Sequence, residues 1–181
     1  MQPNIIQKIY DQHDVECNQK YGETLPYSFH LKAVQAQGLK FIKLLEDPRS
    51  AGKEYREEDL SIALAGHDLI EDGRMTLNDI VSLLQGQIGN TRAKFIAEII
   101  YAVTDEKGRD RMSRKNEKYY KELKENKSAV FVKLADISAN MIYSKLFNTR
   151  MYAMYKVEFA QTKAKLWSKD LAEMFEYVES L

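Results

Sequence analysis

The sequence predicts an all-α protein, and two observations support this prediction. Proline occurs only at positions 3, 26 and 48, so most of the chain lacks the residue that interrupts helices most strongly. Glycines are few, and they cluster between segments in which apolar residues recur at helical spacing. No alternating strand pattern continues for more than a few residues. We therefore expect one helical domain that spans residues 1–181.

Apolar periodicity gives the expected order of the helices along the chain. They are expected near residues 4–18, 28–46, 57–71, 76–86, 91–103, 111–125, 127–147 and 150–179. Thr76 and Asp79 have the spacing of a capping box, which predicts a helix start there. The segments 46–57 and 104–111 are expected to be loops because of their composition. In the last helix, aromatic and apolar side chains recur at helical spacing, which indicates packing into the core.

Composition and charge exclude several classes of protein. Hydrophobic residues make up 44% and charged residues 30% of the chain, which is typical of a globular protein. Basic and acidic residues number 27 each and the isoelectric point is near 6.8, so a dedicated nucleic-acid binder is not expected. No segment approaches the roughly 20 apolar residues of a transmembrane helix. The N-terminus lacks the pattern of a signal peptide, and we expect a cytoplasmic protein without membrane association.

Cys17 is the only cysteine, which excludes an intramolecular disulfide and a cysteine-based zinc site. Histidines are also few, at positions 13, 30 and 67. Any metal site must therefore draw on these histidines and on carboxylates. So small a set favours a mononuclear site over a dinuclear one.

The segment AGHDLIED (65–72) places ionisable residues where the chain otherwise builds core. Burying a carboxylate without a partner is costly, so a cation or solvent is expected beside it. If the helix continues to residue 71, residues four apart share a face, which puts His67 beside Glu71 and Asp68 beside Asp72. His67 and Asp68 can then reach one common point. Imidazole nitrogen and carboxylate oxygen are both good ligands for Mn, Fe or Zn.

Two further segments contain residues that would complete such a ligand set. His30 lies among aromatic and aliphatic residues in PYSFHLKAV. Asp136 is the only carboxylate in the mostly apolar segment AVFVKLADISANM. The spacing of Lys133, Asp136 and Asn140 predicts a narrow polar stripe on a buried helix.

Each of these residues also has a simpler interpretation. His30 alone would be interpreted as a hydrogen-bonded core histidine, and Asp136 alone as the partner of Lys133 or Arg111. An HD dipeptide by itself is common by chance. The occurrence of all of them in one chain favours a metal site.

Together these residues resemble the H…HD…D signature of the HD-domain metal-dependent phosphohydrolases. LPYSFHLKAV, ALAGHDLIEDGRMTLNDI and VKLADISANM resemble, in the same order, segments of the SpoT/RelA-type alarmone hydrolases. YAVTDEKGRDRMSRKNEKYYKEL is similar to the loop and basic helix of that family. The resemblance covers residues 15–145 and implies an HD-domain helical bundle of the stand-alone small alarmone hydrolase type. The C-terminal helical segment 150–179 lies beyond it.

The resemblance also implies a set of site residues. The implied metal ligands are His30, His67, Asp68 and Asp136, holding one Mn²⁺ per chain. The implied catalytic residues are Glu71 and Asp72, and the implied substrate-binding residues are Lys20 and Asn140. Leu31 and Ile137 replace a proline and a basic residue of the family pattern, and the segment before His30 is shorter and less basic.

The implied activity is that of a guanosine-3′,5′-bis(diphosphate) 3′-pyrophosphohydrolase that uses the metal site to activate water. A basic segment would supply local positive charge for such a polyanion through Lys107, Arg109, Arg111, Arg114 and Lys115. Two alternatives stay open. The protein could be a phosphatase for another nucleotide, such as a nucleoside monophosphate or NADPH, or a non-catalytic nucleotide-binding sensor. The expected partner is a small nucleotide, and a homo-oligomer is compatible with the sequence.

Overall fold

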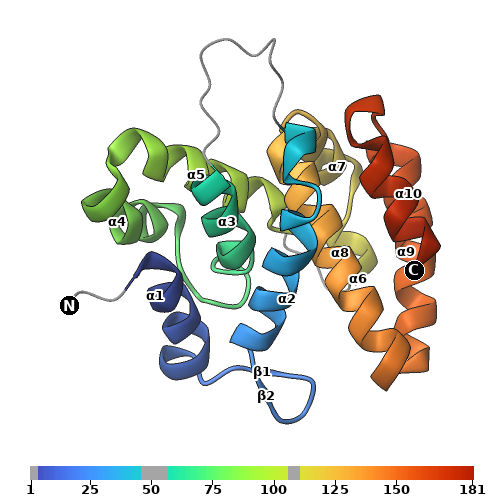
Figure 1. The fold of residues 1–181 in the computed structure, drawn as a ribbon, viewed down its shortest axis with the longest axis horizontal. Coiled ribbons are helices and arrows are strands. Elements are labelled where there is room, and N and C mark those ends of the chain that lie inside the picture. Colours follow the sequence, from blue (N-terminus) through green and yellow to red (C-terminus); the bar gives the residue numbers. More distant parts are fainter. Residues whose placement is uncertain (1–3, 46–56, 106–110) are drawn as a thin grey trace.

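The computed structural model describes residues 4–45, 57–105 and 111–181, with no side-chain description for residues 111 and 112. The predicted all-α class is confirmed, because helices account for most of these residues (Figure 1). The helices are α1 (Ile5–Asp11), α2 (Ser28–Leu39), α3 (Glu57–Gly66), α4 (Leu77–Ile88), α5 (Asn90–Val103), α6 (Arg111–Arg114), α7 (Glu117–Lys124), α8 (Lys127–Phe147), α9 (Thr149–Leu166) and α10 (Ala172–Ser180). None of them is long and apolar enough to cross a membrane.

Shorter elements join some of these helices. A π-helical turn, Gln12–Glu16, continues α1, and single 3₁₀ turns cover Ile42–Leu45 and Lys169–Leu171. Strands β1 (Lys20–Tyr21) and β2 (Leu25–Pro26) form a small antiparallel hairpin in which Tyr21 pairs with Leu25. This hairpin leads the chain directly into α2.

Polar capping residues account for five of the helix starts in the described residues. Asn4, Asn116, Asn126 and Asn148 each accept a backbone N–H with their side-chain oxygen at the start of α1, α7, α8 and α9. The capping box predicted at Thr76 is confirmed, because the Thr76 and Asp79 side chains each accept the other's backbone N–H. These five helix starts are thus encoded locally.

Several predicted helix ends were wrong. The predicted helix 57–71 ends at Gly66, and residues 67–72 form turns instead of a helical face. The predicted helix 4–18 changes from α to π geometry after Asp11, and the helix predicted over 28–46 ends at Leu39. The predicted helix 111–125 is divided between α6 and α7, because Asn116 caps a new helix.

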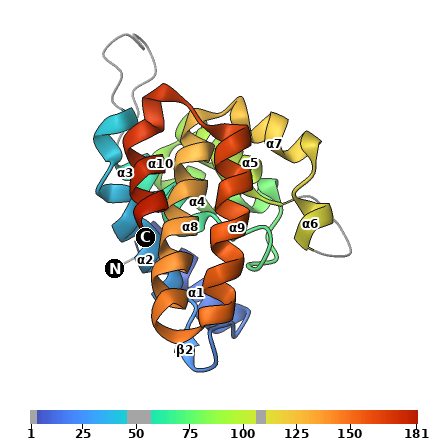
Figure 2. The ribbon, with the colours of Figure 1, turned by 90° about the vertical axis from the view of Figure 1, so that its right-hand side faces the viewer.

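The predicted helix 150–179 is also divided, near Trp167 and Ser168, whose backbones are extended. After this break α10 runs back against α8 and α9 (Figure 2). Most of the loops predicted at 46–57 and 104–111 lie outside the described residues.

Helix α8 lies at the centre of the fold, and its surroundings explain its mostly apolar sequence. It contacts α2, α3 and α5 on one side and α7, α9 and α10 on the other (Figures 1 and 2). Phe131, Leu134 and Ala135 on α8 have no exposed surface. Polar residues on such a helix must be satisfied by other protein groups or by a cavity, and this is the setting of the candidate site.

Candidate metal centre and its cavity

The turn that follows α3 carries the first two candidate ligands. Gly66 allows α5 to approach closely, because a Cβ at this position would lie 2.9 Å from Ile100 Cδ1. The chain then coils tightly: the Asp68 carbonyl accepts from the N–H groups of Asp72 and Gly73. A Cβ on Gly73 would lie 2.7 Å from the backbone oxygen of Leu69, so this turn requires glycine.

His67 is buried and held in one orientation by this geometry. Its Nδ1 donates to the Leu64 carbonyl over 2.9 Å. In the neutral ring this bond leaves the lone pair on Nε2, which lies 3.0 Å from Oδ2 of Asp68. A backbone carbonyl that fixes the histidine tautomer is a common feature of metal sites.

The other two candidate ligands come from α2 and α8. His30 is buried in the first turn of α2, and the Tyr21 ring stacks on it at 4.7 Å between centroids. Asp136 lies on the polar stripe of α8, where the Asn140 amide donates to its Oδ1 over 2.5 Å. The predicted stripe is confirmed, since Lys133, Asp136 and Asn140 all line one cavity.

Three of these side chains, His30, His67 and Asp68, converge on one point, and Asp136 lies beside the two histidines. His30 Nε2 lies 3.3 Å from His67 Nε2, 3.6 Å from Asp68 Oδ2 and 3.4 Å from Asp136 Oδ1. His67 Nε2 lies 3.7 Å from the same oxygen of Asp136. Ligand atoms that are each about 2.1 Å from one ion would be about 3.0 Å apart at right angles and about 3.4 Å apart at the tetrahedral angle.

This arrangement fits a divalent cation. Ligand atoms of His30, His67 and Asp68 all lie within 4.8 Å of one another. The convergence of two imidazole nitrogens and carboxylate oxygens is repulsive unless protons or a cation lie between them. Mixed nitrogen and oxygen donors without sulfur suit Mn, Fe or Zn.

The charge states of Asp68, Asp136 and His67 follow from their mutual contacts and from Lys133. Burial alone would raise the pKa of Asp68 and Asp136, but the adjacent histidines and, for Asp136, the Lys133 ammonium hold both pKa values well below the usual range. Burial alone would lower the pKa of His67, but Asp68 and Asp136 raise it well above the usual value. The carboxylates are therefore ionised and available to a cation.

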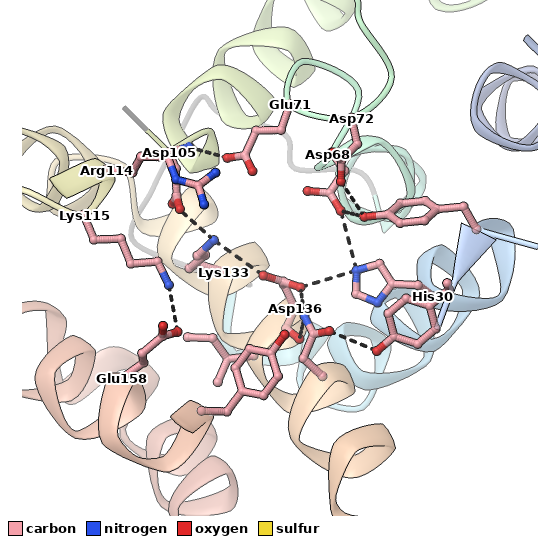
Figure 3. Close-up of a pocket in the computed structure, with 15 residues that line it drawn as sticks. His30, Asp68, Glu71, Asp72, Asp105, Arg114, Lys115, Lys133, Asp136 and Glu158 are labelled. Atoms are coloured by element: carbon pink, nitrogen blue, oxygen red, sulfur yellow. Dashed lines mark hydrogen bonds and ion pairs between the residues drawn. The ribbon is translucent and has the colours of Figure 1, made fainter. Parts of the chain in front are cut away.

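The convergence point lies in the wall of a cavity of about 280 Å³ (Figure 3). His30, Asp68 and Asp136 lie on one side of it, and Arg114 and Lys115 lie on the other. A metal ion at this point would thus be open to a ligand of small-molecule size.

Glu71 and Asp72 also line this cavity. The predicted placing of Asp72 beside Asp68 is confirmed, because the Asp68 carbonyl accepts the Asp72 N–H and the Tyr27 hydroxyl contacts both carboxylates. The Glu71 carboxylate accepts the backbone N–H of Asp105, at the end of α5. Glu71 is exposed in the cavity wall, but the protein around its carboxylate limits hydration and raises its pKa. The Asp72 carboxylate accepts a hydrogen bond from the Tyr27 hydroxyl over 2.9 Å.

Basic side chains also line the cavity, together with acidic partners. Lys133 lies 3.5 Å from Asp136 and 3.7 Å from Asp105, and Lys115 is 3.0 Å from Glu158. The Nε atom of Arg114 is buried and has no hydrogen-bond partner among the described residues. Lys107 and Arg109 lie outside the described residues, as does the side chain of Arg111.

The two implied substrate-binding residues differ in their positions. Asn140 lines the cavity, where its amide oxygen accepts from the Tyr21 hydroxyl over 2.9 Å. Lys20 is exposed on β1 and is not among the residues that line the cavity. The neighbouring Tyr21 lies in the wall instead.

Sequence reasoning missed several residues of the site. Tyr27 was noted only as part of the PYSFH segment, and Asp105 only as part of a loop. Tyr155 packs against the core, as expected for its segment, and it also lines the cavity and an adjoining smaller one of about 170 Å³. In the same C-terminal segment, Phe159 and Met174 are buried as expected. No local pattern distinguishes Tyr155 from these two.

Comparison with models of protein families and with curated proteins found no match to this chain. The fold and the site therefore define the class by themselves. The chain is an all-α protein with a histidine–aspartate cluster that could hold a metal ion beside a polar cavity.

Proposed function

We propose that this protein is a metal-dependent phosphohydrolase that acts on a polyphosphorylated nucleotide. The observation that carries the proposal is the cluster of His30, His67 and Asp68, with Asp136 beside the two histidines, at a cavity whose other side holds Arg114 and Lys115. A cation site and an anion-binding wall in one cavity suit a phosphate ester better than a neutral substrate.

Manganese is the proposed ion. Two imidazoles and two carboxylates are ligands that Mn²⁺, Fe²⁺ and Zn²⁺ all accept, and Mn²⁺ is the ion implied by the resemblance to alarmone hydrolases. When bound, such an ion lowers the pKa of a water molecule and attracts phosphate oxygen.

The remaining polar residues of the cavity would bind the phosphates and move protons. Arg114 and Lys115 would neutralise phosphate charge, and the buried Nε of Arg114, which has no partner among the described residues, is a donor that a phosphate oxygen would satisfy. Glu71 is placed to accept a proton from the attacking water, because its raised pKa makes it a stronger base than an ordinary glutamate. Asp72 is the candidate proton donor or orienting group on the other side.

The adjoining cavity supports a nucleotide rather than a simple phosphate ester. Tyr21, Tyr143, Tyr155 and Asn140 line it, and three of these residues also line the main cavity. Tyrosine rings provide faces on which a base can stack, and the Asn140 amide can pair with a base or sugar. The phosphates would then lie beside Arg114 and Lys115 and the base among the tyrosines.

The leading substrate is guanosine 3′,5′-bis(diphosphate), from which pyrophosphate would be released at the 3′ position. One observation supports a second candidate, namely another nucleotide as the substrate. Lys20 does not line the cavity, and the aromatic Tyr21 stacks on His30 instead. This difference favours a test of other nucleotides, including NADPH and nucleoside monophosphates.

The test is incubation of the full-length protein with Mn²⁺ and a panel of ppGpp, NADPH, nucleoside monophosphates and cyclic dinucleotides. Products are separated by ion-exchange chromatography, and Asp136→Asn serves as the inactive control. GDP plus pyrophosphate from ppGpp is the expected result. Turnover of NADPH or a monophosphate alone would assign the second candidate. Tight nucleotide binding with no product from the whole panel would indicate a sensor and contradict the proposed hydrolase activity.

A further inference from the structure

The π-helical turn reaches three separate parts of the candidate site with three consecutive residues. Gln12 donates through Nε2 to the Gly73 carbonyl over 2.9 Å, at the end of the turn that carries His67 and Asp68. Asp14 accepts the backbone N–H of Ser28 over 2.9 Å, at the start of the helix that carries His30. Between them, the His13 ring stacks on Tyr27. π-Helical turns are rare and are frequently found at functional sites.

His13 is held rigidly in this arrangement. Its side chain has no exposed surface, and its Nδ1 lies 2.8 Å from the amide oxygen of Gln19. Because that oxygen only accepts, the ring proton is on Nδ1. His13 and Tyr27 lie almost parallel, with ring centroids 4.9 Å apart and an interplanar angle of 19°. The imidazole ring therefore holds the tyrosine ring in place by stacking on it.

Tyr27 makes the contact with the site through its hydroxyl. This oxygen lies 2.6 Å from Oδ2 of Asp68 and 2.9 Å from Oδ2 of Asp72. A phenol carries one proton, so a single donor serves two carboxylates. One of these carboxylates is a candidate metal ligand and the other is a candidate catalytic group. Without the hydroxyl, the two negative groups would face each other with no donor between them.

We propose that Tyr27, held by the π-helical turn, is a positioning residue of the candidate metal centre. It acts through Asp68, whose oxygen it fixes toward the two histidines, and through Asp72, which it keeps beside the cavity. Its effect on turnover rests on the proposed function, whereas its effect on metal affinity does not. Residues that support metal ligands by hydrogen bonds typically change metal affinity by about 10- to 100-fold when they are replaced.

The first test uses Tyr27→Phe, which removes the hydroxyl and keeps the ring. Metal-free full-length protein is titrated with Mn²⁺, and the free ion is measured by electron paramagnetic resonance. We expect the dissociation constant to rise by about 10- to 100-fold while the circular dichroism spectrum is unchanged. The matched control is Tyr152→Phe, which removes a hydroxyl bonded to the Leu181 carbonyl away from the cavity lining. The control should bind Mn²⁺ like the original protein.

The second test separates the stacking role of His13 from a role of its free nitrogen. His13→Phe keeps a ring against Tyr27, whereas His13→Ala removes it. We expect Mn²⁺ affinity to be preserved in His13→Phe and weakened in His13→Ala, with both variants folded. An equal loss of Mn²⁺ affinity in both variants would overturn the proposal that His13 acts by stacking on Tyr27.

The outcomes distinguish the two proposals. Normal Mn²⁺ affinity in Tyr27→Phe would overturn the positioning role, whatever the substrate. If the original protein binds Mn²⁺ and Tyr27→Phe binds it weakly, but no substrate of the panel is turned over, the positioning role stands and the hydrolase proposal fails. Absence of Mn²⁺, Fe²⁺ and Zn²⁺ binding in the original protein would overturn both.

Discussion

The ammonium group of Lys133 lies 3.5 Å from Oδ2 of Asp136, one turn later on the same helix. The two carboxylate oxygens of Asp136 therefore have different partners. Oδ1 faces the histidines, and Oδ2 faces the lysine. Lys133 also reaches Asp105, and these three side chains are no more than 14% exposed. A lysine in this position balances the excess of carboxylates around the cavity and aligns one of the candidate ligands.

Lys133→Met should therefore destabilise the protein. Removing one partner from a buried set of charges leaves the others unpaired, and we expect a loss of about 3 kcal/mol in the free energy of unfolding, measured with urea. Adding Asp105→Asn should restore part of that loss. In contrast, Lys118→Met breaks an exposed pair with Glu122 and should change the stability by less than about 0.5 kcal/mol. Equal losses in the free energy of unfolding from both substitutions would show that the ion pairs of Lys133 do not stabilise the fold.

Purified protein should contain close to one transition metal ion per chain. Elemental analysis after exhaustive dialysis checks this, and His67→Ala should abolish the bound metal because it removes the ligand that is fixed by Leu64. Asp136→Asn is a second variant of nearly unchanged shape, which covers the case in which His67→Ala does not fold. Two tightly bound ions per chain would contradict the predicted mononuclear site.

Glu71→Gln should separate metal binding from catalysis. The amide oxygen can still accept the N–H of Asp105, so the fold and the metal content should be preserved. Loss of the carboxylate as a base should reduce turnover of the true substrate by about 10²- to 10⁴-fold. Glu122→Gln on α7 is the matched control and should turn over substrate normally. A fully active Glu71→Gln would refute the assigned role.

The capping box gives a prediction about pH. Hydrogen bonds from Thr76 hold the pKa of Asp79 below its usual value in the folded protein. A depressed pKa stabilises the fold at pH values above the unfolded pKa, and this contribution is lost as the pH falls through the folded pKa. The difference in melting temperature between the original protein and Asp79→Asn should therefore be present at pH 6 and should shrink toward pH 3. A difference that does not depend on pH would exclude the ionised carboxylate as the cause.

Part of the site was predictable because its spacing is local. His67 and Asp68 are neighbours in the chain, so they reach one point whether or not the helix continues past Gly66. The stripe from Lys133 through Asp136 to Asn140 depends only on helical periodicity, and α8 satisfies it. The helix expected to carry Glu71 beside His67 was wrong, because the chain forms turns after Gly66.

The sequence by itself determined the all-α class, the main helix starts and the identities of the residues in the histidine–aspartate cluster. Helical periodicity and capping are properties of neighbouring residues, so they can be predicted from the chain directly. Only the tertiary structure decided that the Tyr27 hydroxyl lies between Asp68 and Asp72, or that Tyr155 lines the cavity. These contacts join segments that are distant in the chain, and their geometry follows from how α2, α3, α8 and α9 pack, which no local pattern encodes.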